Sequence, residues 1–180
     1  MGQTELVSKD PFDWFDAWYG ETVATGLQDP NAMTLATAGS DGRSSARVVL
    51  LKSHDDRGFV FYSNMESRKG RQMKEVPWAS LSFFWREQGR QIRIEGQIEF
   101  VDDAQADLYF ASRPRISQLG AWASKQSQPL ASRRVLEDRV KELQERYPEG
   151  TSIPRPSHWT GVRVVPQIME FWDAGDYRLH

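Results

Sequence analysis

The sequence contains no cysteine, no long apolar run and almost no net charge. With 0 Cys in 180 residues, disulfides and thiolate metal sites are excluded. No segment approaches the roughly 18 consecutive apolar residues of a membrane span, and the opening MGQTELVSKD lacks the apolar part of a signal peptide. A formal net charge of -2 gives no basic field for nucleic acid or an anionic membrane. We therefore expect a soluble, cytoplasmic protein that binds neither nucleic acid nor membrane, and in which any anion site is local.

Aromatic residues, by contrast, are plentiful. The chain has 7 Trp and 9 Phe, and 39% of its residues are hydrophobic. A chain of this length can bury them in one sizeable core. We therefore expect a single domain over residues 1–180, in which residues 1–9 form a flexible N-terminal tail.

The spacing of apolar residues predicts a helix, a series of strands, further helices and a return to strands. Asp10 and Pro11 are typical of an N-cap and a first helical position. β-rich segments separated by turn residues then predict an antiparallel meander over residues 32–39, 44–53 and 58–63. The later expected elements are a short helix (67–76), strands (79–85 and 90–100), helices (104–112, one that starts or kinks at Pro114, and 131–147), a loop (148–159) and two strands that Pro166 separates or bulges (161–172). Sequential strands with tight turns favour a mainly antiparallel β-barrel with peripheral helices over a parallel doubly wound sheet.

Two groups of cations border apolar strands and predict an anion site. Arg47 and Lys52 are five residues apart in one expected strand, so they point to opposite faces, about 17 Å apart, and cannot share one phosphate. Arg68 and Lys69 follow Ser67 at an expected helix start, where free backbone N–H groups favour an anion. The alternatives are strand-end side chains that reach water and a solvated helix end. Together the cations suit a phosphate-bearing ligand that lies across the barrel.

Two further sets of residues suit a second ligand. Tyr109, Arg113 and Ser117 are spaced i, i+4, i+8, which would align a phenol, a guanidinium and a hydroxyl for a second phosphate, although the intervening proline argues against one helix. Arg178 and His180 are two apart, so they share a face if the chain end is extended. The alternatives are a packing pair on a helix and ordinary surface residues at a chain end.

Five segments in order resemble the pyridoxamine (pyridoxine) 5'-phosphate oxidase family. They are RVVLLK, GFVFYSNMESRKGRQ, RQIRIEG, YFASRPRISQLGAWASKQS and FWDAGDYRLH, and the match runs from about Asp10 to the last residue. The resemblance implies an FMN-binding split β-barrel with peripheral α-helices, assembled as a homodimer with FMN at the subunit interface. It also implies oxidation of pyridoxamine or pyridoxine 5'-phosphate to pyridoxal 5'-phosphate by dioxygen, which gives hydrogen peroxide. That reaction belongs to pyridoxine biosynthesis.

The resemblance also assigns roles to residues at matching positions. Those implied to bind FMN are Arg47, Val48, Val49, Leu50, Leu51, Lys52, Tyr62, Ser63, Arg68, Lys69, Gln91, Gln126, Ser127 and Trp172. Those implied to bind the substrate phosphate are Lys52, Tyr109, Arg113 and Ser117. Arg178 and His180 are implied to contact the pyridine ring and to act as catalytic residues at the reacting carbon. No metal is expected.

Two alternatives to this function stay open. A relative with the same barrel and flavin but another substrate is one, such as the flavin oxidases of phenazine biosynthesis; the full set of phosphate-binding residues argues against it. A non-catalytic binder of FMN or pyridoxal phosphate is the other, because family members usually continue beyond the RLH motif with Asp-Arg whereas this sequence ends at His180.

Overall fold

The structure, a computed structural model, describes residues 9–178, so the predictions for residues 1–8 and for His180 lie outside the described residues. Its strands are β1 (Ala32–Ala38), β2 (Ser44–Leu50), β3 (Ser53–Asp55), β4 (Gly58–Asn64), β5 (Trp78–Trp85), β6 (Arg90–Phe100) and β7 (Trp159–Asp173). Its α-helices are α1 (Pro11–Ala24), α2 (Arg68–Glu75), α3 (Asp103–Ser112), α4 (Arg115–Ala123) and α5 (Arg133–Arg146). Two short 3-10 helices, η1 (Arg86–Gln88) and η2 (Asp176–Arg178), complete the described elements. None of these helices combines the length and apolar character needed to cross a membrane.

The strands form one antiparallel sheet in the order β2-β1-β5-β6-β7-β4-β3. The two edge strands, β2 and β3, follow each other in the chain and are joined only by Leu51 and Lys52. The sheet therefore curls until its edges meet at this link, as in a barrel that stays open elsewhere. The predicted antiparallel split barrel with peripheral helices is confirmed.

The predicted meander is correct for its hairpins but wrong for its order. β1 pairs with β2 and β3 pairs with β4 across the predicted turns. The strand predicted over residues 44–53 is wrong, because it divides at Leu51 and Lys52 into β2 and β3, which lie on opposite edges of the sheet. β4, however, takes β7 as its other partner, and β1 takes β5. Local turn chemistry specifies hairpins, whereas these long-range pairings depend on how the curled sheet buries its inner face.

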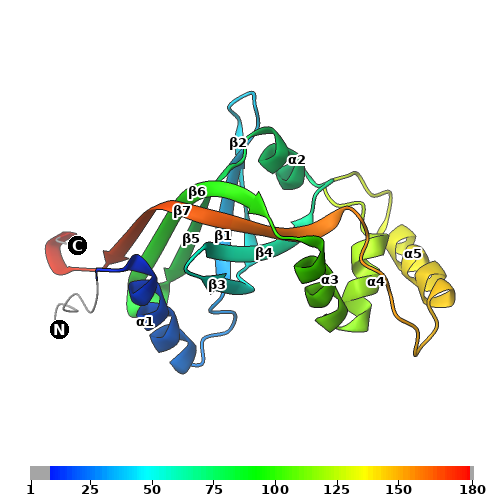
Figure 1. Cartoon of the computed structure of the whole chain (residues 1–180), viewed down its shortest axis with the longest axis horizontal. Helices are drawn as coiled ribbons and strands as arrows, with labels where there is room; N and C mark the ends of the chain where they lie inside the picture. The colour runs from blue at the N-terminus through cyan, green and yellow to red at the C-terminus, as the bar shows by residue number, and fades with distance from the viewer. Residues whose placement is uncertain (1–8, 179–180) are drawn as a thin grey trace.

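The barrel interior is the main core. Inward-facing residues alternate along β1, β5 and β6, and α1 closes one end of the barrel with the fully buried Phe15 and with Trp18. Asp10 caps α1 by accepting a hydrogen bond from the Phe12 amide, as the sequence predicts. In Figure 1, α1 lies at one end of the sheet, and α3, α4 and α5 lie at the other.

Proline positions explain two differences from the predicted elements. Residues 159–173 form one strand, β7, instead of two, and Pro166 faces a register shift between Glu95 and Gly96. The predicted bulge is therefore confirmed and the separation into two strands is wrong. Pro114 separates α3 from α4, so Arg113 has extended backbone with φ -72° and ψ 149°. The residues predicted to bind the substrate phosphate on either side of Pro114 thus do not share one helical face.

Candidate functional site

A cleft of about 480 Å³ lies where the ends of β2 and β4 meet α2 and α4. Ten predicted site residues line it: Val48, Val49, Leu50, Lys52, Tyr62, Ser63, Lys69, Arg113, Ser117 and Gln126. These residues come from segments that are far apart in the sequence. The fold therefore brings much of the predicted flavin set and part of the predicted phosphate set to one place.

The turn before α2 presents Lys69 to the cleft. The Ser67 hydroxyl caps α2 by accepting a hydrogen bond from the Gly70 amide at 3.2 Å, and it donates to the Asn64 carbonyl at 2.7 Å. A side chain at Gly70 would lie 2.5 Å from the Met65 Cα, so only glycine allows this close packing. Lys69 is 8% exposed, and its Nζ donates to Gln126 Oε1 at 2.8 Å.

The cations beside this turn are held by neutral groups. Arg47 donates through Nη1 to the Leu35 carbonyl at 3.2 Å and to Thr37 Oγ1 at 2.7 Å, and through Nη2 to the Ser45 hydroxyl. Burial, and then the charge of Arg68, lower the pKa of Arg47. Burial, and then the charge of Arg47, lower the pKa of Lys69 to about 8. The positive charges are thus close enough to repel one another.

Other arginines with little exposure form ion pairs with carboxylates, whereas the cations around the cleft form none with a described carboxylate. Arg163 pairs with Asp55, Arg155 pairs with two aspartates, and Arg90 pairs with Glu21. Within residues 9–178, no carboxylate forms an ion pair with Arg47, Arg68, Lys69, Lys52 or Arg113. Because buried charge needs compensation, this cleft is suited to an anionic ligand.

Arg113 faces the cleft with unused hydrogen-bonding capacity. Its guanidinium lies 4.8 Å from the Trp159 ring centroid, and its buried Nη1 has no hydrogen-bond partner. Burial lowers its pKa, against the opposing effect of Tyr109. Tyr109 stacks on Tyr62 with ring centroids 3.9 Å apart, and Ser117 lines the cleft from α4. We call Tyr109, Arg113 and Ser117 the anion clamp.

Between residues 9 and 173, the remaining predicted site residues do not line the cleft, and two of them, Arg47 and Tyr109, lie beside residues that do. Leu51 is buried in the core, Arg68 is exposed at the first position of α2, and Ser127 lies in the loop before α5 with φ 65°. Gln91 of β6 pairs with Trp172 of β7, and Trp172 lies thirteen residues along β7 from Trp159. That separation corresponds to about 40 Å of strand. One copy of the chain therefore does not bring these two residues to the cleft.

The chain end differs from the extended conformation used to pair Arg178 with His180. β7 ends at Asp173, and Arg178 belongs to η2, in which Tyr177 has φ 56°. The expectation that Arg178 continues a strand is wrong. Only the backbone of Arg178 is described, so its predicted role and that of His180 stay predictions.

Sequence reasoning missed some of the residues that line the cleft. Trp159 was expected in a loop but starts β7, and Asn64, Gly120, Ala121 and Ser124 also line the cleft. Asn64 carried a signal, because Asn followed by a helix start is typical turn chemistry. Trp159 carried none, because the contacts of its ring are with residues far away in the sequence.

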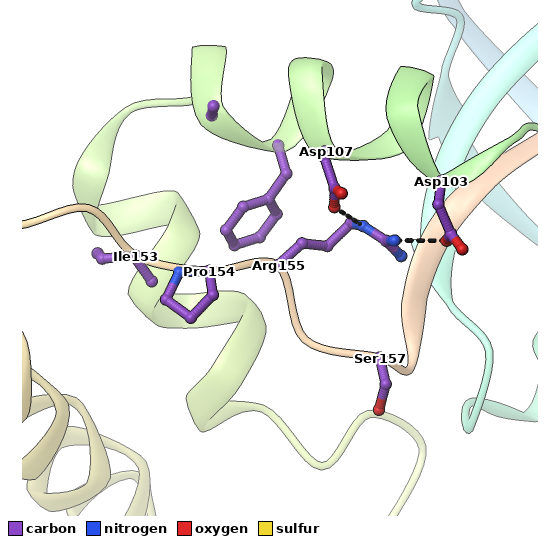
Figure 2. Close-up of a pocket in the computed structure, with 8 residues that line it drawn as sticks. Asp103, Asp107, Ile153, Pro154, Arg155 and Ser157 are labelled. Carbon is purple, nitrogen blue, oxygen red and sulfur yellow. Dashed lines mark hydrogen bonds and ion pairs between the residues drawn. The ribbon is translucent and has the colours of Figure 1, made fainter.

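A second and larger cavity, of about 670 Å³, lies beside α3 (Figure 2). The only cation among the described residues that line it, Arg155, is paired with two carboxylates, Asp103 and Asp107, so the cavity carries no unpaired positive charge. It therefore lacks the uncompensated positive charge that distinguishes the cleft, and the cleft is the candidate site.

Fold and cleft together define a split-barrel protein with a cleft bordered by cations that no carboxylate of the described residues neutralises. A sequence profile described as pyridoxamine 5'-phosphate oxidase matches residues 20–147. Pyridoxine/pyridoxamine 5'-phosphate oxidase of Myxococcus xanthus (strain DK1622) is 54% identical over 175 residues, which are 97% of this chain and 84% of that protein. The protein of the same name from Trichormus variabilis is 52% identical over 174 residues, or 97% of this chain and 81% of that one. The chain belongs to the pyridoxamine 5'-phosphate oxidase family.

Solved structures agree with this assignment. PhzG from Burkholderia lata 383, crystallised with tetrahydrophenazine-1-carboxylic acid, superposes with a TM-score of 0.92 at 36% identity, covering 100% of this chain and 89% of that one. A pyridoxamine 5'-phosphate oxidase-related, FMN binding protein from Nostoc punctiforme gives a TM-score of 0.71 at 16% identity, covering 92% of this chain and 85% of that one. The second comparison shows a shared fold.

Proposed function

We propose that this protein is an FMN-dependent oxidase that converts pyridoxamine or pyridoxine 5'-phosphate to pyridoxal 5'-phosphate with dioxygen, giving hydrogen peroxide. The observation that carries this proposal is the set of uncompensated cations around the cleft. Family membership supplies the reaction class, and the two cation groups supply places for two phosphates. The cytoplasmic location stays a prediction from the sequence.

The first phosphate position lies at the start of α2. Lys69 carries buried positive charge there, the partly buried Arg47 adds a second cation, and Arg68 adds a third at the helix N-terminus. These groups fit the FMN phosphate, because a dianion relieves the repulsion between Arg47 and Lys69. When bound, FMN supplies a two-electron acceptor that dioxygen reoxidises.

The anion clamp and Lys52 form the second position and would hold the substrate phosphate. The unpartnered Nη1 of Arg113 gains a charge-assisted hydrogen bond when an anion enters. Binding the non-reacting phosphate in this way orients the carbon that carries the amine or alcohol. Arg178 and His180 would hold the pyridine ring and stabilise charge at that carbon.

A homodimer would complete the site. Trp172 lies at the end of β7 far from the cleft, and Gln91 is its partner on β6. Both residues are nevertheless predicted to contact the same flavin. A second copy of the chain, related by a two-fold axis, can place its Gln91 and Trp172 end beside the cleft of the first. We therefore propose that FMN lies between two subunits.

Oxidation of a phenazine precursor is the second candidate. The likeness to PhzG, solved with tetrahydrophenazine-1-carboxylic acid, favours it. The presence of Lys52, Tyr109, Arg113 and Ser117 around the cleft favours a phosphorylated substrate instead.

An anaerobic visible spectrum tests the proposal. The purified protein should show the flavin absorption of bound FMN, which should bleach within seconds when pyridoxamine 5'-phosphate is added. Admitting dioxygen should restore the absorption and release one hydrogen peroxide per substrate. Bound FMN that bleaches only with a dihydrophenazine carboxylate would establish the second candidate. FMN that no substrate reduces would leave a binding protein, and a colourless protein that takes up no FMN would refute the proposal.

A further inference from the structure

Trp159 contacts two of the three side chains of the anion clamp, Tyr109 and Arg113. Its ring is 6% exposed and lies parallel to those of Tyr62 and Tyr109, at centroid distances of 5.1 and 6.1 Å. Phe110 meets it edge-on at 5.2 Å, and the Arg113 guanidinium lies over it at 4.8 Å. The side chains that set the shape of the clamp therefore rest on one indole.

Arg155 fixes the backbone of Trp159 by a hydrogen bond to its carbonyl. Its Nη1 donates to the Trp159 carbonyl at 2.7 Å, its Nε to Asp107 at 2.5 Å and its Nη2 to Asp103 at 2.6 Å. Figure 2 shows the guanidinium of Arg155 pointing toward the two carboxylates of α3, the helix that also carries Tyr109. One planar side chain thus joins the start of β7 to α3.

A second arginine that lies over a tryptophan, Arg90 over Trp18, provides a comparison for Arg113 over Trp159. Arg90 lies over Trp18 at 4.5 Å, but it also pairs with Glu21. Arg113 lies over Trp159 without a carboxylate, and its Nη1 is buried and unpartnered. An aromatic face attracts the guanidinium while leaving its N–H groups unused, whereas a carboxylate would occupy them.

We propose that Trp159, anchored by Arg155, is the positioning residue that keeps Arg113 free for an anion and so gives the site its preference for a phosphorylated substrate. The inference rests on the proposed function and deepens it. Replacing the aromatic face should let the guanidinium move or turn, so that an entering phosphate must first reorder it. The preference for the anion should fall without loss of the site for FMN.

Titration with inorganic phosphate tests the role of Trp159 without turnover. The protein is saturated with FMN, so that the flavin-phosphate position is filled, and phosphate binding is followed by calorimetry. Trp159→Leu should weaken phosphate binding about tenfold and Trp159→Phe about threefold, in line with the strength of a desolvated cation–π contact. Trp18→Phe is the matched control, and it should lower thermal stability but leave phosphate binding unchanged. Wild-type phosphate affinity in Trp159→Leu would overturn the proposal.

Substrate selectivity separates positioning from a general structural role. Trp159→Leu should raise KM for pyridoxamine 5'-phosphate with a small change in kcat, and should leave kcat/KM for unphosphorylated pyridoxamine unchanged. Equal losses for both substrates would mean that Trp159 only holds the fold.

Arg155→Met provides a second, independent variant. Asp103 and Asp107 have side chains 88% and 62% exposed, so they stay solvated when the arginine is removed. We expect about threefold weaker phosphate binding, with partial recovery in Arg155→Lys, which restores a positive charge and N–H donors but not the planar fork of a guanidinium. An unchanged affinity in Arg155→Met would remove the anchor from the proposal.

If the chain takes up no FMN, the proposed function fails, and the same titration in a Lys69→Met background still reports on the clamp.

Discussion

The protonation state of Lys69 depends on whether an anion lies beside it. Folding lowers its pKa from 10.5 to about 8, first through burial and then through Arg47. The unfolded chain therefore holds this proton more tightly, and the contribution of Lys69 makes the ligand-free protein more stable as the pH rises from about 8 toward 10.5. A phosphate beside Lys69 favours the protonated form and reverses this preference.

FMN binding should accordingly depend on pH. Because the flavin phosphate binds the protonated lysine, its affinity should fall about tenfold between about pH 7.5 and 9. Lys69→Met should bind FMN about ten- to a hundredfold more weakly at neutral pH, since a charge-assisted bond is lost, and should show no such fall. Fluorescence titration of the ligand-free protein measures both quantities. Lys74→Met, on the exposed part of the same helix, should behave as wild type, and an unchanged profile in Lys69→Met would refute the assignment.

At this scale the sequence predicted charges better than contacts. Arg47 and Lys69 could be singled out as cations beside apolar runs, and Arg113 by its spacing from Tyr109 and Ser117. The structure places all three cations without a carboxylate partner among the described residues. The importance of Trp159 could not be predicted. Its partners lie on β4, α3 and the link to α4, and only the folded chain brings them together.

At the scale of elements, the bulge at Gly96 is where two strands approach too closely for a side chain. A Cβ on Gly96 would lie 2.0 Å from the Val165 carbonyl oxygen, next to Pro166. Proline marks such irregularities in a sequence because it cannot donate to the ladder, so Pro166 indicated the bulge. The sequence did not indicate that the strand continues past it, because the pairing of β7 with β6 is set by burial over the whole sheet.

Gly96→Ala should therefore be strongly destabilising. The added methyl group must push β6 and β7 apart, and we expect a loss of about 2 to 3 kcal/mol in the free energy of unfolding, measured with urea. Gly20→Ala in α1 is the control, because nothing lies within 4 Å of the added Cβ. It should raise stability by up to about 1 kcal/mol. Equal effects of the two substitutions would show that the bulge tolerates a side chain.

At the scale of the whole molecule, the main feature is the distance between the two ends of β7. Figure 1 shows β7 crossing the molecule from the helices α3 and α4 to the end near α1. The cleft lies at its first residues, while Trp172 lies at its other end. The family resemblance implied a dimer with FMN at the subunit interface, and the separation along β7 gives that prediction a geometric reason.

Mixing two inactive variants tests the shared site. Arg113→Ala removes a residue of the cleft, and Arg178→Ala removes a residue beyond β7, so a mixed dimer should contain one intact site and one doubly defective site. Random exchange of subunits should restore about a quarter of wild-type activity. Mixing Arg113→Ala with Ser117→Ala, which affect the same half, should restore none. A monomer by sedimentation that retains stoichiometric FMN would contradict the dimer.

The length of β7 also limits how sequences of this kind can diverge. Because one strand reaches from the cleft of its own chain to Trp172, a single inserted or deleted residue in it would rotate one end to the wrong face and shift it by about 3.3 Å. The hairpin turn between β1 and β2, at residues 39–43, does not connect two parts of the site and is largely exposed. Length variation among homologues should therefore collect in that turn and be rare in β7, except as compensating changes at the bulge opposite Gly96.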